Sequence, residues 1–169
     1  MNPGPSGPRG SMMTIERTYD ASLDEVWALW TTRDGIEAWW GPEGFSVKVH
    51  AIDLRPGGEL RYAMTARDPD QVAFMKSAGM PLTTETRLTY TEVEPEGRLA
   101  YAHHADFIPG VAPYPVRTVI EFHPEKGKVR MVLRFDPMHE KDWTDRAVMG
   151  RESELRKLAR LIESRSRKG

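Results

Sequence analysis

The chain has 169 residues, and its 24 Lys plus Arg against 25 Asp plus Glu give a formal net charge of -1 at pH 7. This balance supplies no overall field to gather nucleic acid or anionic lipid, and no apolar run approaches the roughly twenty residues that cross a bilayer. We therefore expect neither nucleic-acid binding nor membrane insertion. The absence of cysteine excludes disulfides, thiolate metal sites and cysteine nucleophiles. We expect a cytoplasmic protein without a cofactor.

The first twelve residues, "MNPGPSGPRGSM", hold Gly, Pro and Ser in place of apolar residues and lack the apolar run of a signal peptide. We expect residues 1–12 to be disordered or the remnant of an expression tag. Residues 13–166 are expected to form a single domain. It begins with "TIERTYDA", residues 14–21, whose alternation of apolar and polar side chains predicts a half-buried strand.

Two short helices are expected after this strand. Ser22 and Glu25 have the spacing of a capping box. Apolar residues then recur at the spacing of one helix face, at Leu23, Val26, Trp27 and Trp30. Residues 33–40 predict a second helical segment, which ends at Gly41-Pro42 because proline cannot continue the hydrogen-bond ladder.

From Phe45 the apolar period changes to two, which predicts a strand. A Pro-Gly-Gly turn separates it from a second strand at residues 59–66, so the two form an antiparallel hairpin. Residues 67–84 are too many for a tight turn but can hold a short helix at 70–77. We expect this segment to be a flap over one end of the sheet.

The remaining sequence predicts a meander of strands followed by a long helix. Four further strand-like runs are separated by short, turn-rich segments, at residues 86–94, 98–107, 116–122 and 129–135. In the last run, apolar residues alternate with Arg130 and Arg134, as in a sheet that is buried on one side only. Residues 140–165 have helical spacing and would extend on the order of 39 Å. This order predicts an α+β fold with a curved antiparallel sheet around a C-terminal helix.

Several segments resemble a known superfamily. They are "ASLDEVWALWTTRDGIEAWWGPEGFSV", "IDLRPGGELRY", "YTEVEPEGRLAY" and a terminal helix in which Leu155 and Leu158 follow a glycine. Together they resemble the SRPBCC superfamily of START-like, birch-pollen-allergen-like proteins. Within it they are most similar to the branch named after the C-terminal domain of the activator of the ninety-kilodalton heat-shock protein ATPase. The resemblance extends over nearly all of residues 13–162.

The resemblance implies a helix-grip fold, in which about seven strands surround the long C-terminal helix and enclose an apolar cavity. Two short helices after the first strand would close one end. The sequence departs from the family at one position: where the family's terminal helix usually carries Gly-Trp, this chain has Gly150 and Arg151. Either Trp143, about two turns earlier, packs in place of that tryptophan, or Arg151 puts a charge near the cavity mouth.

Four of the five tryptophans lie within residues 27–40. We expect Trp27, Trp30 and one of Trp39 and Trp40 to fill core volume. Neighbouring residues on a helix point about 100° apart, so Trp39 and Trp40 should not both face the core squarely. The less buried of the two would form the rim of the cavity.

His103 and His104 face opposite sides of a strand, so they cannot chelate one metal, and no metal site is expected. His103 shares the apolar side. It could hold a ligand oxygen, act as a general base, or be satisfied by a tyrosine or backbone neighbour. Three tyrosines on the apolar faces of their strands are either core residues or cavity lining, namely Tyr62, Tyr90 and Tyr101.

The main hypothesis is a domain that binds an apolar small molecule in a cavity above roughly 300 Å³ between sheet and helix. Its expected ligand-binding residues are Trp39, Trp40, Tyr62, Tyr90, Tyr101, His103, Phe74, Met75 and Arg151. One alternative is a co-chaperone-like interaction domain with a role in stress response, whose partner is a chaperone or a second copy of the chain. Another is a hydrolase or cyclase of the same fold that uses His103, although no catalytic residue is assigned.

Overall fold

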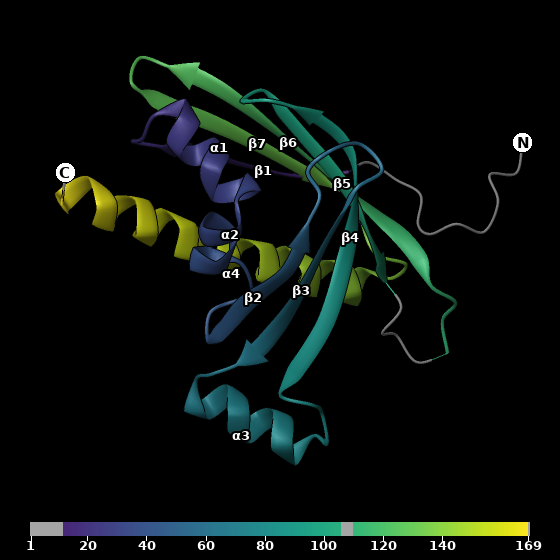
Figure 1. The fold of residues 1–169 in the computed structure, drawn as a ribbon. Coiled ribbons are helices and arrows are strands. Elements are labelled where there is room, and N and C mark those ends of the chain that lie inside the picture. Colours follow the sequence, from purple (N-terminus) through teal and green to yellow (C-terminus); the bar gives the residue numbers. More distant parts are fainter. Residues whose placement is uncertain (1–11, 106–109, 169) are drawn as a thin grey trace, which may run out of the picture.

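The computed structural model describes residues 12–105 and 110–168. The predicted N-terminal segment lies outside the described residues except for Met12, and so do Asp106 and Phe107 at the end of one predicted strand. The described residues form a curved antiparallel sheet with a long C-terminal helix across one face (Figure 1). This arrangement confirms the predicted α+β helix-grip fold.

The sheet has seven strands in the order β1-β7-β6-β5-β4-β3-β2, and every neighbouring pair is antiparallel. Only the β1–β7 pair joins strands that are distant in sequence. The bounds are Met13–Tyr19 (β1), Phe45–Ile52 (β2), Glu59–Ala66 (β3), Thr83–Glu94 (β4), Arg98–Ala105 (β5), Tyr114–Glu125 (β6) and Lys128–Phe135 (β7). On the outer face, Glu121 pairs with Arg98 at 2.7 Å and with Arg134 at 3.1 Å.

Helices α1 (Leu23–Thr31) and α2 (Arg33–Trp39) follow β1, as predicted. The Ser22 hydroxyl oxygen accepts a hydrogen bond from the backbone N–H of Glu25 at 3.4 Å, which satisfies one of the free donors at the start of α1. Thr32 separates the two helices and caps α2, because its hydroxyl oxygen accepts the N–H of Gly35 at 3.0 Å. The two helices therefore begin where the sequence places polar capping side chains.

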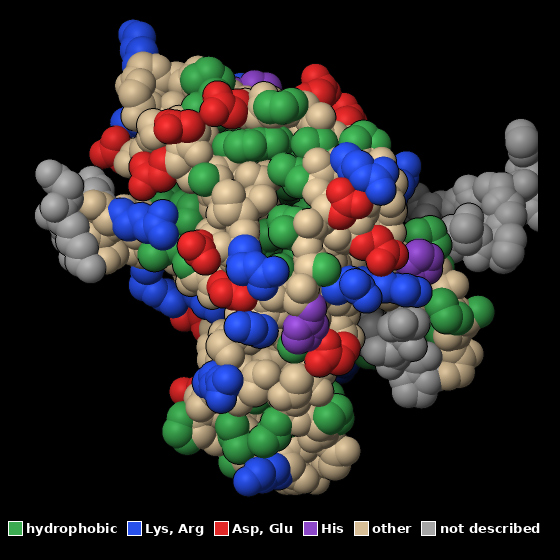
Figure 2. Space-filling model, viewed as in Figure 1, with side chains coloured by type: hydrophobic (Ala, Val, Ile, Leu, Met, Phe, Trp, Pro, Cys, Tyr) green, Lys and Arg blue, Asp and Glu red, His purple; other side chains and the backbone are tan. Residues whose placement is uncertain are grey.

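Helix α3 (Pro69–Ser77) projects from the ends of β3 and β4, away from the rest of the sheet (Figure 1). The predicted short helix is present, but it extends beyond the end of the sheet and does not cover that end as a flap. Met75 is the one buried residue of the helix, which thus has no continuous apolar face to hold it against the fold. Hydrophobic side chains gather on this projecting lobe (Figure 2), and Phe74 is 61% exposed.

Helix α4 (Lys141–Lys168) crosses the concave face of the sheet (Figure 1). It buries Leu155, Leu158 and Ile162 in the main core, where each is at most 4% exposed. These residues have the helical spacing that the sequence shows, so packing of one apolar face fixes the helix on the sheet. Among the described residues, no helix is both long enough and apolar enough to span a membrane.

Candidate functional site

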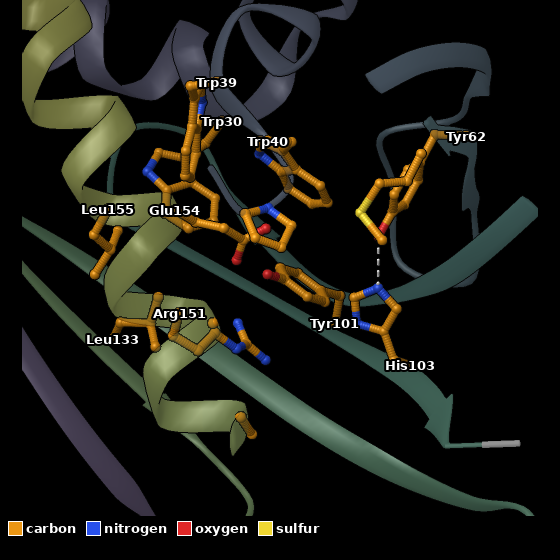
Figure 3. Close-up of a pocket in the computed structure, with 14 residues that line it drawn as sticks. Trp30, Trp39, Trp40, Tyr62, Tyr101, His103, Leu133, Arg151, Glu154 and Leu155 are labelled. Atoms are coloured by element: carbon orange, nitrogen blue, oxygen red, sulfur yellow. Dashed lines mark hydrogen bonds between the residues drawn. The ribbon is translucent and has the colours of Figure 1, made fainter. Parts of the chain in front are cut away.

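A cavity of about 350 Å³ lies between the sheet, the segment that follows α2, and α4 (Figure 3). Its volume falls at the lower end of the range that is typical of small-molecule sites, roughly 300–1,000 Å³. It is lined by Trp30, Trp39, Trp40, Pro42, Tyr62, Met64, Tyr101, His103, Leu133, Ala147, Gly150, Arg151, Glu154 and Leu155.

One face of α4 supplies the helical wall of the cavity. The lining residues of this helix are Ala147, Gly150, Arg151, Glu154 and Leu155. Their spacing of three, four, seven and eight residues from the first puts them on a single face. Gly150 and Glu154 were not among the predicted site residues, although their helical spacing relative to Leu155 indicates both.

Trp39 and Trp40 are both buried, with exposed fractions of 2% and 6%. The prediction that only one of them faces the core is wrong. The 100° spacing does not apply to this pair, because α2 ends at Trp39 and the backbone of Trp40 is extended, with φ −62° and ψ 155°. Trp30 packs edge-to-face against both, with ring centroids 4.8 Å from Trp39 and 6.1 Å from Trp40.

Trp40 is the less buried of the pair, and it connects the tryptophan cluster to the sheet. Its ring centroid lies 5.5 Å from that of Tyr62 and 6.1 Å from that of Tyr101. Trp39 instead donates its indole N–H to the backbone carbonyl of Leu29 at 2.8 Å. Trp39 therefore anchors α2 to α1, while Trp40 forms an aromatic wall of the cavity and packs against tyrosines of the sheet.

His103 projects from β5 toward Tyr62 on β3 (Figure 3), and the Tyr62 hydroxyl lies 3.1 Å from the His103 Nε2 atom. Burial lowers the pKa of His103 to about 3, and the nearby charges of Arg151 and His104 act in the same direction. The imidazole is therefore neutral near pH 7, and its tautomer sets whether Nε2 donates to the Tyr62 hydroxyl or accepts from it. Efficient general bases have a pKa near the working pH, so His103 is better suited to hold a ligand oxygen than to remove a proton.

The polar corner of the cavity contains Tyr101, Arg151 and Glu154, whose polar ends point toward one another (Figure 3). An Arg151 Nη2 donates to the hydroxyl oxygen of Thr118 at 2.7 Å, and its guanidinium carbon lies 4.7 Å from the ring centroid of Phe135. Burial raises the pKa of the Tyr101 hydroxyl, and the Arg151 charge opposes this effect. Of the two predicted consequences of having Arg151 where the family usually has tryptophan, the structure shows the second: Arg151 brings a charge to the cavity.

Glu154 and Lys157 connect α4 to the loop after α2. The Glu154 carboxylate accepts the backbone N–H of Gly41 at 2.9 Å, and Gly41 adopts a φ of 88° that favours glycine. The Lys157 Nζ atom lies 3.1–3.4 Å from four backbone carbonyl oxygens, those of residues 40, 41, 42 and 45. Burial raises the pKa of Glu154 and lowers that of Lys157. These contacts hold the tryptophan-bearing wall against the helix.

Three predicted site residues lie outside this cavity, and so does Trp143, which was considered as a replacement for the family's usual tryptophan. Tyr90 is 1% exposed and packs inside the core, with its ring centroid 6.5 Å from that of Tyr101. Phe74 and Met75 are on the projecting helix α3, which carries them away from α4. Trp143 packs with a separate small cluster that contains Tyr114 and Met138, so it does not take the place of Arg151.

The opposite face of the sheet has a hollow of about 680 Å³ among exposed, mostly charged side chains, including His50, Arg61, Glu85, Arg87 and His104. His50 and Glu85 are 2.9 Å apart within it. Within residues 12–105 and 110–168, no three His, Asp or Glu side chains are arranged to hold a metal ion. The concave cavity is therefore the site where apolar surface and a few polar groups converge.

A sequence profile described as Activator of Hsp90 ATPase homolog 1-like protein matches residues 20–163, which include every residue that lines the cavity. The chain belongs to this family. The family assignment agrees with the resemblance of the quoted segments, and it covers α1 through most of α4. Comparison with curated protein sequences gives no match.

Solved structures of similar fold include members of this family. Protein CV1439 from Chromobacterium violaceum is 21% identical, with a TM-score of 0.71 over 90% of this chain and 97% of that one. The AHSA1-like protein from Aeromonas hydrophila is 19% identical, with a TM-score of 0.67 over 91% and 94% of the two chains. The AHSA1 protein from Silicibacter pomeroyi is 20% identical, with a TM-score of 0.67 over 92% and 99%. At these identities the likeness shows the shared fold alone.

Proposed function

We propose that this protein binds an apolar small molecule in the cavity between the sheet and α4. The observation that carries the proposal is the cavity of about 350 Å³, bordered by aromatic and aliphatic side chains from β3, β5, β7 and two helical regions. A space of this size that is held open by five separate parts of the chain favours a binding role.

The lining supports a ligand that is mainly apolar. Three tryptophan rings, Met64, Leu133 and Leu155 supply apolar surface on several sides. Burial of a ligand's apolar surface contributes about 25 cal/mol per Å². Polar groups are few and fixed, as in the His103–Tyr62 pair at 3.1 Å, so they would orient a ligand while the aromatic walls supply most of the attraction.

Native mass spectrometry of freshly purified protein tests this proposal directly. The expected result is a population heavier than the apoprotein by the mass of a small molecule, which is released on denaturation. Titration with the neutral fluorophore N-phenyl-1-naphthylamine supplies an independent test, and we expect saturable binding at a single site. The proposal is wrong if no small molecule copurifies and the fluorophore also fails to bind.

A second candidate function is contact with a protein partner such as the heat-shock ATPase, and it is favoured by the lobe that contains α3. Phe74 and Met80 are large hydrophobic side chains with exposed fractions of 61% and 49%. Their proximity in sequence makes this lobe the part of the surface best suited to a protein contact. Pull-down with the chaperone tests it, and Phe74→Ser with Met80→Ser should abolish any capture.

A further inference from the structure

Arg151 is the fixed positive charge in the cavity lining. A guanidinium stays protonated at all physiological pH values and offers five N–H donors. The side chain is half-buried, and it contacts the Thr118 hydroxyl oxygen at 2.7 Å, the face of Phe135 and the Tyr101 hydroxyl. Among residues 12–105 and 110–168, no carboxylate lies within the 4.0 Å of an ion pair with Arg151. Its charge and several of its donors are therefore available to a ligand.

Glu154 is the carboxyl group in the lining, and its hydrogen bond is with the loop after α2 and not with Arg151. It accepts the Gly41 N–H at 2.9 Å, and Lys157 lies one helical turn further along α4. Burial raises the pKa of this carboxyl, which favours the neutral acid. The remaining titratable groups of the lining are His103, which is neutral, and the phenols of Tyr62 and Tyr101. Arg151 is thus the cationic group of the lining, and the Glu154 carboxyl is held by the Gly41 N–H.

We propose that the ligand of this cavity is an apolar monocarboxylate, with its carboxylate on the Arg151 guanidinium and its apolar body against the tryptophan rings. This inference rests on the proposed function and names the class of its ligand. A planar carboxylate matches the fork of N–H donors that a guanidinium presents, and such pairs are strong when water is excluded. The hydroxyl of Tyr101, which points toward the same corner (Figure 3), supplies a further donor.

The geometry also limits the charge of the ligand. One arginine stands in the lining, and Glu154 is beside it on the same helix face. A second anionic group would have no cationic partner in the lining, so its desolvation would not be compensated. A monoanion is therefore preferred over a dianion such as a phosphate monoester.

The test compares two ligands of nearly the same shape, 1-naphthaleneacetate and 1-naphthaleneacetamide, by isothermal titration calorimetry at pH 7. We expect the acid to bind the unmodified protein about 10- to 100-fold more tightly, which is the usual effect of a charged hydrogen-bonded pair. Arg151→Gln should remove this preference, so that the acid and the amide bind the variant with nearly equal affinity. Arg146→Gln, an equal change of charge on an exposed residue of α4 outside the cavity, should retain it.

The outcomes separate this inference from the function on which it rests. Equal binding of acid and amide to the unmodified protein would overturn the monocarboxylate, a result that needs no variant to fold. So would binding of N-phenyl-1-naphthylamine with no binding of either naphthalene compound. Failure of all three compounds to bind would instead overturn the proposed function itself.

Discussion

Gly150 allows the cavity to be filled without removing any existing contact. It lies in the interior of α4 on the face that lines the cavity, and a Cβ atom built at this position meets no heavy atom within 4 Å. Glycine in a helix interior is less favourable than alanine by about 0.8–1.0 kcal/mol, and leucine has nearly the propensity of alanine. Both Gly150→Ala and Gly150→Leu should therefore stabilise the protein by about 1 kcal/mol, which raises the melting temperature by about 2–4 °C for a chain of this size.

The two variants should differ in ligand binding. The leucine side chain extends into the space of about 350 Å³ that the ligand would occupy, whereas the alanine methyl group takes up little of it. Overpacking costs about 1–3 kcal/mol, so Gly150→Leu should weaken N-phenyl-1-naphthylamine binding about 5- to 150-fold. Circular dichroism melting and fluorescence titration measure the two effects. A stable Gly150→Leu variant that binds as tightly as the unmodified protein would refute the reasoning.

Three further predictions follow from the contacts and pKa shifts. Burial lowers the pKa of His103 from 6.5 to about 3, so between these pH values the unfolded chain binds more protons than the folded chain. The folded protein therefore loses stability as the pH falls from 6.5 toward 3. In urea unfolding, His103→Gln should reduce this loss by up to about 1.4 kcal/mol per pH unit. The raised pKa of Glu154 acts in the opposite direction in both proteins; equal slopes would contradict the assignment to His103. Lys157→Met should destabilise the fold by about 1–3 kcal/mol because four carbonyl oxygens lose their donor. Lys141→Met, which removes an exposed ion pair, should leave stability nearly unchanged. Similar effects of the two substitutions in urea unfolding would count against the Lys157 contacts. Phe74→Ser should leave stability within about 0.5 kcal/mol and fluorophore binding unchanged, and a large loss of binding would place α3 in the site.

The sheet and the principal helices could be predicted because their signals are local. Alternation places Tyr62, Tyr101 and His103 on the concave face, and all three line the cavity. Two β-bulges interrupt the pairing, between Val49 and Ala51 and between Tyr90 and Glu92. A period of two in the sequence carries no sign of an inserted residue, so the depth at which Tyr90 packs could not be derived from its strand alone.

The positions that sequence reasoning misplaced depend on where elements end and what they contact. Trp40 turns inward because α2 stops one residue before it, and helix ends are uncertain by a residue or two from sequence. Helix α3 projects away from the sheet because it has only one buried residue, Met75, and so lacks the apolar contacts that would hold it against the fold. Glu154 was missed because a carboxylate on an apolar helix face is ordinarily exposed, and only the contact with Gly41 explains its position.

The indole N–H resonances of the five tryptophans provide the most direct measurement of ligand binding in the cavity. Trp30, Trp39 and Trp40 line the cavity, whereas Trp27 packs against Phe122 and Trp143 lies in the separate cluster. In a two-dimensional ¹H–¹⁵N titration with N-phenyl-1-naphthylamine, we predict that the three cavity resonances shift together and saturate while the other two stay in place. Shifts confined to Trp27 and Trp143, or saturable binding that moves none of the three, would contradict a ligand site between the sheet and α4.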